Sequence, residues 1–349
     1  MKEQTLKLCI CGHFAFGQQR TNGQTVKTAN LYEALQSRFD VVPIDTYHWK
    51  RHPFRLLFRL MAAERHCDAI IMLPAHNGVR VFSRLFVTLN KVFRKRLFYD
   101  VIGGWLPELT VRYPRMAACL KRFDGIWVET TAMEQALVQQ GFSNITVVPN
   151  FKDLRILTPQ ELTYSIDKPY RLCTFSRVMK EKGIEDAVAA VRTVNEKQGE
   201  TVFSLDIYGP VDEHYRERFD SLQAAFPDYI RYRGTVPAAE SVETLRPYFA
   251  LLFPTYYEGE GLAGTIIDAM ASGVPVISSD WRYNTEIIAE GINGLIFKTH
   301  NQKSLEKRLL YASENVEAVN NMRKKCLEAA EHYTKATFEQ KVLSILLNV

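Results

Sequence analysis

The stretch FPTYYEGEGLAGTIIDAMASGVPVISSDWRYNTE, residues 253–286, decides how the rest of the chain is interpreted. An apolar run at 251–253 predicts a buried strand that Pro254 ends. A glycine-rich loop follows, then a short helix at about 265–272 that Gly273 terminates with a left-handed cap. The run 274–278 predicts the next strand. Strand, loop, short helix and strand make a parallel βαβ unit, and open sheets of such units bind ligands where their strands end.

Two acidic residues, Glu260 and Asp268, carry the chemistry of this stretch. Seven residues separate them, so both carboxylates can point into one crevice. Gly261 and Gly264 allow the backbone to approach a ligand closely. The helix start at Gly264 and Thr265 offers unpaired N–H groups and a positive dipole end to a phosphate. An ordinary surface loop is the alternative, but these features occur together and favour a nucleotide site, with a ribose diol near the second carboxylate.

The same residues resemble the nucleotide-sugar site of the retaining glycosyltransferases of family 4, which have the GT-B fold. The family pattern is Glu, seven residues, then Glu-Ala-Met-Ala-x-Gly-x-Pro-Val, and here Glu260 is followed after seven residues by DAMASGVPV. The resemblance implies that Glu260 faces the donor sugar and that Asp268, in place of the family's Glu, holds the ribose. The donor-binding residues expected in this stretch are Gly261, Leu262, Ala263, Gly264, Thr265 and Asp268.

A pair of cations earlier in the second half fits the same site. Arg177 and Lys182 follow a predicted strand at 170–175 and precede a helix, where they can neutralise a diphosphate. Family 4 members have Arg and Lys at this spacing. The resemblance also implies that two later loops wrap the base, mainly through the backbone of Gly209, Pro210, Gly234, Thr235 and Val236. No cofactor and no metal are expected, because two cations and a helix dipole suffice; the donor would be UDP- or GDP-linked.

The first half repeats the strand–loop–helix pattern, with strands predicted at 6–11, 41–44, 68–74, 97–102, 125–130 and 146–151. Asn22 and Gly23, at the end of the first loop, look like the counterpart of the family's Gly-Gly loop. Family members carry a His after the fourth strand, where this chain has Gly103 or Gly104. His76 and His13, each after a neighbouring strand, are candidate substitutes, although both are more often structural. The acceptor-side candidates are therefore His13, His76, Gly104 and Trp105, the last by stacking on a sugar.

Charge is distributed unevenly along the chain. Residues 47–122 contain 15 Lys or Arg against 4 Asp or Glu, and the rest contain 29 against 35. A helix from Pro53 would place Arg55 and Arg59 on one face, and a second basic amphipathic stretch covers 82–97. The apolar face of the first helix would comprise Phe54, Leu57, Phe58 and Met61.

These two stretches have two interpretations. Either the apolar faces belong to the core and the cations are simply solvated, or the basic half contacts an anionic membrane surface or a lipid-diphosphate acceptor. Nucleic acid is disfavoured, because no nucleic-acid-binding motif accompanies the charge. No apolar run is long enough to span a bilayer, the start MKEQTLKLCICG lacks a signal-peptide layout, and the 6 scattered cysteines suit a reduced, cytoplasmic protein.

The 349 residues and 46% hydrophobic content suit two domains. The predicted fold is α/β, of the GT-B type, with two doubly wound Rossmann-like domains facing across a cleft. Residues 1–151 form the acceptor-binding domain, 152–169 a linker and 170–334 the nucleotide-sugar domain, while a C-terminal helix at about 335–349 crosses back to the first domain.

The predicted function is retaining transfer of a sugar from a nucleotide sugar to a carbohydrate or lipid-linked saccharide acceptor. Similar motif variants occur in bacterial enzymes of capsule, exopolysaccharide or lipopolysaccharide assembly. The alternatives are a non-catalytic sugar-nucleotide-binding subunit, which the missing His favours, and a GT-B epimerase or phosphorylase.

Overall fold

The computed structural model describes residues 6–17 and 23–347, and the chain divides into two compact units. Unit 1 comprises residues 1–151 and 335–349, and unit 2 comprises residues 152–334. Each unit is built on one fully parallel sheet of six strands with helices packed against it. The predicted α/β class with two doubly wound sheets is confirmed.

The sheet of unit 1 has the strand order β2-β1-β3-β4-β5-β6. Its strands are β1 (Lys7–Gly12), β2 (Asp40–Asp45), β3 (Ala69–Met72), β4 (Arg96–Asp100), β5 (Gly125–Val128) and β6 (Ile145–Val147). Its helices are α1 (Gly23–Leu35), α2 (Pro53–His66), α3 (His76–Phe93), α4 (Leu106–Arg112), α5 (Pro114–Leu120), α6 (Thr131–Gln139) and α14 (Lys335–Leu347). The apolar runs of β1, β3, β4 and β5 are buried on both faces, as parallel sheets require.

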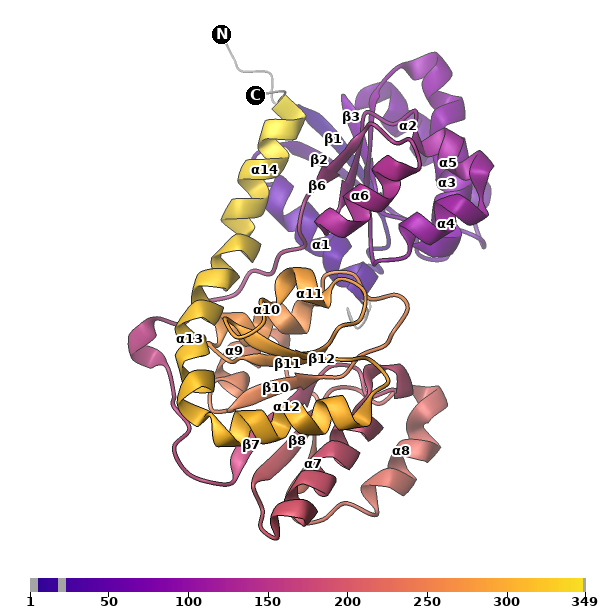
Figure 1. Ribbon diagram of the computed structural model, residues 1–349. Helices are drawn as coiled ribbons and strands as arrows, with labels where there is room; N and C mark the ends of the chain where they lie inside the picture. Colours follow the sequence, from indigo (N-terminus) through magenta and orange to yellow (C-terminus); the bar gives the residue numbers. More distant parts are fainter. Residues whose placement is uncertain (1–5, 18–22, 348–349) are drawn as a thin grey trace. The chain divides into compact units, whose positions relative to one another are not determined.

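Helix α14 returns from the end of the chain to unit 1, where it lies beside α1 (Figure 1). Phe338, Val342 and Leu346 are its buried residues. The ring of Phe338 stacks on Phe151 with centroids 4.3 Å apart. Arg96 donates hydrogen bonds to the carbonyls of Leu346 and Ile345 at 2.5 and 2.9 Å, satisfying two of the acceptors that a helix end leaves unpaired.

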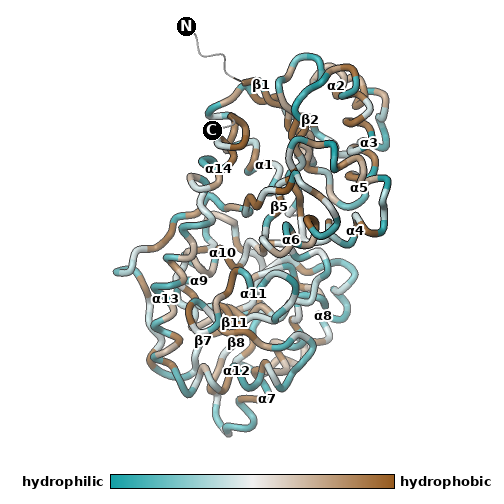
Figure 2. Tube along the Cα trace, turned by 45° about the horizontal axis from the view of Figure 1, so that its top comes forward, coloured by the Kyte–Doolittle hydropathy of each residue, from teal (hydrophilic) through white to brown (hydrophobic). Residues whose placement is uncertain are grey.

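The sheet of unit 2 has the strand order β12-β11-β10-β7-β8-β9. Its strands are β7 (Tyr170–Phe175), β8 (Phe203–Tyr208), β9 (Ile230–Gly234), β10 (Ala250–Phe253), β11 (Val276–Ser279) and β12 (Gly294–Phe297). Its α-helices are α7 (Ile184–Gln198), α8 (Arg216–Gln223), α9 (Ser241–Leu245), α10 (Gly264–Ala271), α11 (Asn284–Ile287), α12 (Gln302–Glu314) and α13 (Val316–Ala330). Figure 2 shows the hydrophobic strand β11 inside and the largely hydrophilic helix α8 outside.

Segment 152–169, predicted as a linker, packs onto unit 2. Leu157 and Leu162 are buried in a hydrophobic cluster with residues of α10 and α13. The Leu157 N–H donates a hydrogen bond of 3.0 Å to the carbonyl of Ala271 at the end of α10. The prolines and charges of this segment therefore do not keep it away from the core.

The interpretation of the α2 apolar face as core is wrong for most of its residues. Phe54 and Phe58 are 76% and 70% exposed, and Met61 is 39% exposed. The buried residues of α2 are Leu56, Leu60, Ala63 and Glu64 instead. The helix has apolar residues on two faces, and the tertiary structure buries the face that carries Leu56 and Leu60. No helix in the described part of the chain is both long and apolar enough to cross a membrane.

Candidate functional site

In unit 2 the chain direction across the sheet reverses at β7, which lies between β10 and β8. In doubly wound sheets the connections on either side of such a point run over opposite faces, so we expect the loops after β7 and β10 to leave a crevice where ligands bind. Lys182 comes from the first of these loops and Glu260 from the second. The two residues that the sequence singled out therefore reach the same point from positions far apart in the chain.

Lys182 and Glu260 form a close ion pair in this crevice. The Lys182 Nζ lies 2.5 Å from the Glu260 Oε2, and their side chains are only 13% and 9% exposed. The hydroxyl of Thr255, after β10, donates to the same oxygen at 2.9 Å. The ammonium also lies 5.1 Å from the ring centroid of Tyr257, within range of a cation–π contact. A cation and a carboxylate are thus held together in a partly dry site.

The backbone at Gly183 and Gly209 fixes the loops around this pair. Gly183 has φ 72°, and a Cβ on it would lie 2.2 Å from the carbonyl oxygen of Pro254. Gly209 has φ 131°, and a Cβ there would lie 1.9 Å from the carbonyl oxygen of Ser176. Only glycine allows these close approaches. The loops after β7, β8 and β10 therefore meet through backbone contact.

Arg177 lies in the loop after β7, and its side chain is 43% exposed. Its Nη1 lies 3.6 Å from the Asp212 carboxylate. Because the side chain is exposed, its guanidinium is accessible to an anion. The N–H of Val178 donates to the carbonyl of Pro210, and the Gly209 N–H donates to the carbonyl of Gly234. Thr235 and Val236 follow Gly234, at the end of β9. The predicted base-binding positions therefore belong to neighbouring strand ends of one sheet.

The residues between Glu260 and α10 differ in what they expose. Leu262 and Ala263 are 5% and 6% exposed and join the core, so only their backbone is available for a ligand. Gly264 and Thr265 begin α10. The hydroxyl oxygen of Thr265 is buried and makes no hydrogen bond within the described residues.

The Asp268 carboxylate, to which the resemblance gave the ribose role, is buried and already paired in the structure. It is 2% exposed, and both of its oxygens accept hydrogen bonds of 2.6 Å from the Lys152 ammonium. Ser241 donates a third, of 2.9 Å. No local motif pointed to Lys152, which lies in the predicted linker, 116 residues from Asp268 along the chain.

In unit 1 the strand order reverses at β1, which lies between β2 and β3. His13 follows β1 and contacts the ring of Tyr47 edge-on at 5.0 Å. Burial lowers the pKa of His13, which favours its neutral form. His76 begins α3 and lies edge-on to Trp105 at 5.3 Å.

His76 and Trp105 therefore lie together at the strand ends of unit 1, next to the buried Gly104, while His13 pairs with a different ring. Gly23 is the exposed first residue of α1. Asn22 falls outside the described residues.

A buried ion cluster in unit 1 was also missed. The Lys27 ammonium on α1 lies 2.9 Å from Asp100, at the end of β4, and 2.8 Å from Glu129, after β5. It also donates a 2.5 Å hydrogen bond to the Val101 carbonyl. Burial raises the pKa of the Asp100 carboxyl to about 6, against the attraction of Lys27. The two acids stand at strand ends in the sequence, but nothing local pairs them with Lys27.

Residues 6–17 and 23–347 contain no group of three or more His, Cys, Asp or Glu side chains arranged to hold a metal ion. Three cations lie at or near the candidate site of unit 2 instead, namely Arg177, Lys182 and Lys152.

Comparison with known families identifies the larger part of unit 2. Residues 163–332 match the family described as glycosyl transferases group 1. This part of the chain is a glycosyltransferase group 1 domain. The match includes the predicted cation pair, Glu260 and Asp268 of this glycosyltransferase domain.

Relatives of known name agree with the glycosyltransferase prediction. The GtfA subunit of a UDP-N-acetylglucosamine–peptide N-acetylglucosaminyltransferase from Streptococcus gordonii is 28% identical over 237 residues, which are 65% of this chain and 46% of that protein. The amylovoran biosynthesis glycosyltransferase AmsK of Erwinia amylovora is 24% identical over 158 residues, 44% of this chain and 38% of that protein. The chain thus spans less than half the length of these two relatives.

Among solved structures, Anabaena HepE in complex with UDP covers 99% of this chain and 100% of its own, with a TM-score of 0.78 and 14% identity. At this identity the likeness shows the fold, which is GT-B. The predicted GT-B architecture of this chain is therefore confirmed.

Proposed function

We propose that this protein is a retaining glycosyltransferase of family 4 that moves a sugar from a nucleotide-sugar donor to a carbohydrate or lipid-linked saccharide acceptor. The assembly of bacterial capsule, exopolysaccharide or lipopolysaccharide is the context that we propose, supported by the name of the amylovoran relative. One observation carries the proposal: Lys182 and Glu260 meet at the strand-order reversal of a glycosyltransferase group 1 domain.

In the proposed reaction the bond between the anomeric carbon and the leaving diphosphate oxygen breaks. The acceptor hydroxyl oxygen then bonds to the same face of that carbon, and its proton passes to the leaving phosphate. Arg177, Lys182 and the first N–H groups of α10 would stabilise the charge that builds on the diphosphate. Glu260 would stabilise positive charge at the anomeric carbon. No metal or cofactor takes part in this scheme.

The donor is the first element to test. We expect a thermal-shift screen of UDP, GDP, ADP and their sugars to raise the melting temperature with one base, because a ligand that binds only the folded state stabilises it. UDP is the expected base, since the fold neighbour HepE was solved with UDP. If none of the nucleotides shifts the transition, the donor-site proposal is wrong.

The rival function is a non-catalytic sugar-nucleotide-binding subunit, which the glycines at 103 and 104 favour because family members carry a histidine there. A donor-hydrolysis and transfer assay on the wild type and Glu260→Ala separates the two. An enzyme turns the donor over and loses that turnover in Glu260→Ala. A binding subunit shows a nucleotide shift but no turnover in either protein, and an epimerase releases free nucleotide without acceptor.

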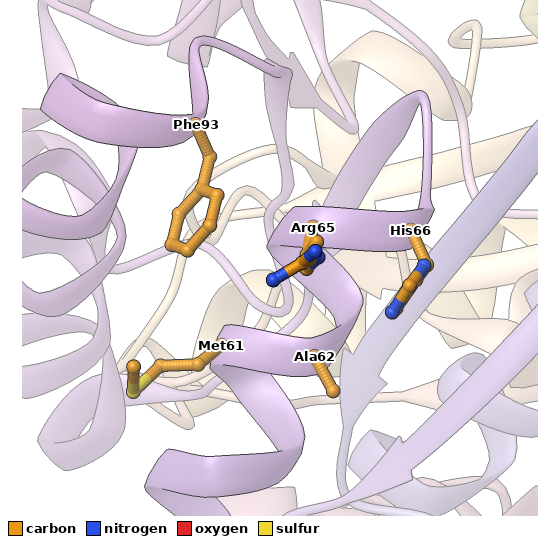
Figure 3. Close-up of a pocket in the computed structure, with 5 residues that line it drawn as sticks. All are labelled: Met61, Ala62, Arg65, His66 and Phe93. Atoms are coloured by element: carbon orange, nitrogen blue, oxygen red, sulfur yellow. The ribbon is translucent and has the colours of Figure 1, made fainter.

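We also propose that unit 1 contacts the anionic surface of the cytoplasmic membrane, so that the protein is peripheral on its inner face. Phe54 and Phe58 project from α2, beside a groove of about 380 Å³ whose lining includes Met61, Arg65 and Phe93. Figure 3 shows Met61 and Phe93 on two helices, with the Arg65 guanidinium beside them. Apolar rings next to cations match a headgroup–acyl boundary.

This surface predicts a measurable loss of membrane affinity. Phe54→Ser with Phe58→Ser is expected to weaken binding to vesicles containing anionic phosphatidylglycerol by at least tenfold, because each inserted ring contributes about 1.5–3 kcal/mol. The matched control is Val111→Ser with Val138→Ser, which alters two exposed residues of α4 and α6. Vesicle flotation at several salt concentrations measures both pairs. Equal vesicle binding by the two double variants would show that α2 is not part of the proposed membrane-contacting surface.

A further inference from the structure

Lys152 pairs with Asp268, the residue to which the resemblance gave the ribose role. The Lys152 Nζ lies 2.6 Å from both carboxylate oxygens of Asp268, and the Ser241 hydroxyl donates a hydrogen bond of 2.9 Å to one of them. The backbone of Lys152 is fixed by a hydrogen bond of 3.2 Å to the carbonyl of Tyr333. All four residues belong to unit 2, so the arrangement is internal to one compact body.

Exposure decides which member of the pair a ligand can reach. The Asp268 side chain is 3% exposed, whereas that of Lys152 is 21% exposed. The Lys152 Nζ lies 3.9 Å from the position of a Cβ built on Gly264, the first residue of α10. The lysine therefore covers the carboxylate and places its ammonium beside the helix start. An ammonium has three donors, and Asp268 uses two of them.

We propose that Lys152 is a further donor-binding residue that contacts the diphosphate of the nucleotide sugar, and that Asp268 is a positioning residue that holds Lys152. This inference rests on the proposed function, because it requires a donor site in unit 2. A buried carboxylate whose oxygens are already occupied gains little from a ribose diol. An ammonium fixed by that carboxylate, next to unpaired N–H groups, is suited to a phosphate oxygen.

The competing arrangement, in which Asp268 binds the ribose, predicts the opposite change in nucleotide affinity when Lys152 is replaced. If Asp268 instead binds the ribose, Lys152 merely occupies it in the empty protein, and removing the lysine frees the carboxylate and tightens nucleotide binding. If Lys152 binds the phosphate, removing it weakens binding. Lys152→Met keeps most of the side-chain length and removes the charge. Calorimetry with UDP, or with whichever nucleoside diphosphate stabilises the wild type, measures the difference.

We expect Lys152→Met to weaken binding of the nucleoside diphosphate by about 10–100-fold, the range of one charge-assisted hydrogen bond. Binding of the nucleoside alone, measured by ligand-observed NMR, should be unchanged. Adding Asp268→Asn to Lys152→Met should not weaken diphosphate binding further, because the two residues act as a unit. Asp268→Glu should retain more affinity than Asp268→Asn, since it keeps a carboxylate for the lysine.

The matched control is Lys168→Met, which breaks another 2.6 Å lysine–carboxylate pair in unit 2, with Glu200, at an exposed position. It should bind the nucleotide as the wild type does. Unchanged or tighter diphosphate binding by Lys152→Met overturns the inference, as does an equal loss for the nucleoside. If the wild type binds no nucleotide at all, the proposed function fails first, which distinguishes the two failures.

Discussion

Replacing Lys182 by alanine is expected to lower kcat by about 10²–10³-fold, the usual effect of removing one group that stabilises developing charge. The side chain is largely enclosed, so its ammonium acts with little screening by water. It pairs with Glu260 at 2.5 Å, which holds it at the strand-order reversal where the donor diphosphate is proposed to lie. Steady-state transfer kinetics at saturating donor measure the effect.

Lys180→Ala is the control for this variant. Lys180 is exposed in the same short turn, Lys180–Lys182, and no contact of its ammonium with the site is found in the described residues. It should keep wild-type kcat. Circular dichroism checks that Lys182→Ala is folded, because the change leaves Glu260 with Thr255 as its hydrogen-bond donor. A kcat within threefold of wild type for folded Lys182→Ala would exclude a role for this lysine in leaving-group stabilisation.

Lys27→Met is expected to destabilise the protein by about 3–5 kcal/mol, because it leaves Asp100 and Glu129 as buried carboxylates without their cation. The lysine side chain is 7% exposed and the two acids are 2% and 4% exposed, so water cannot replace the pair. Urea unfolding monitored by tryptophan fluorescence measures the loss. Lys7→Met, which breaks an exposed pair with Asp40, is the control and should change stability little.

The pH dependence of this destabilisation follows from Asp100. Its folded-state pKa, about 6, lies above the ordinary value, so the folded protein binds this proton more tightly than the unfolded chain does. Stability linked to that proton is present at low pH and is lost as pH rises through the window between about 4 and 6. Without the attraction of Lys27, the pKa of Asp100 should rise further. The loss of unfolding free energy caused by Lys27→Met should therefore grow from pH 5 to pH 7. A loss that shrinks over this range would contradict the claim that the variant buries a carboxylate without a cation.

Part of the fold and of the candidate site could be predicted from the sequence. Apolar runs at regular spacing predicted both sheets, because parallel strands are buried on both faces. The resemblance to family 4 glycosyltransferases placed Arg177 and Lys182 in the same site as Glu260, and in the structure Lys182 and Glu260 form an ion pair. The first of these inferences depends on local pattern, and the second on a family motif.

Contacts set by tertiary packing could not be predicted in this way. Lys152 meets Asp268 across 116 residues, and Lys27 meets Glu129 across 102. The orientation of α2 could not be decided from the sequence for a related reason. Both of its faces carry apolar residues, and only the packed structure shows that Leu56 and Leu60 are buried while Phe54 and Phe58 face outward.

The central claim is that a nucleoside diphosphate binds unit 2 at the meeting point of the loops after β7 and β10. A crystal structure of the protein with the stabilising nucleoside diphosphate tests it most directly. The predicted result places the terminal phosphate within about 3.2 Å of the Lys182 Nζ or the Arg177 guanidinium, beside the first turn of α10. A nucleotide bound in unit 1, or in unit 2 with its phosphates remote from both cations, would contradict it.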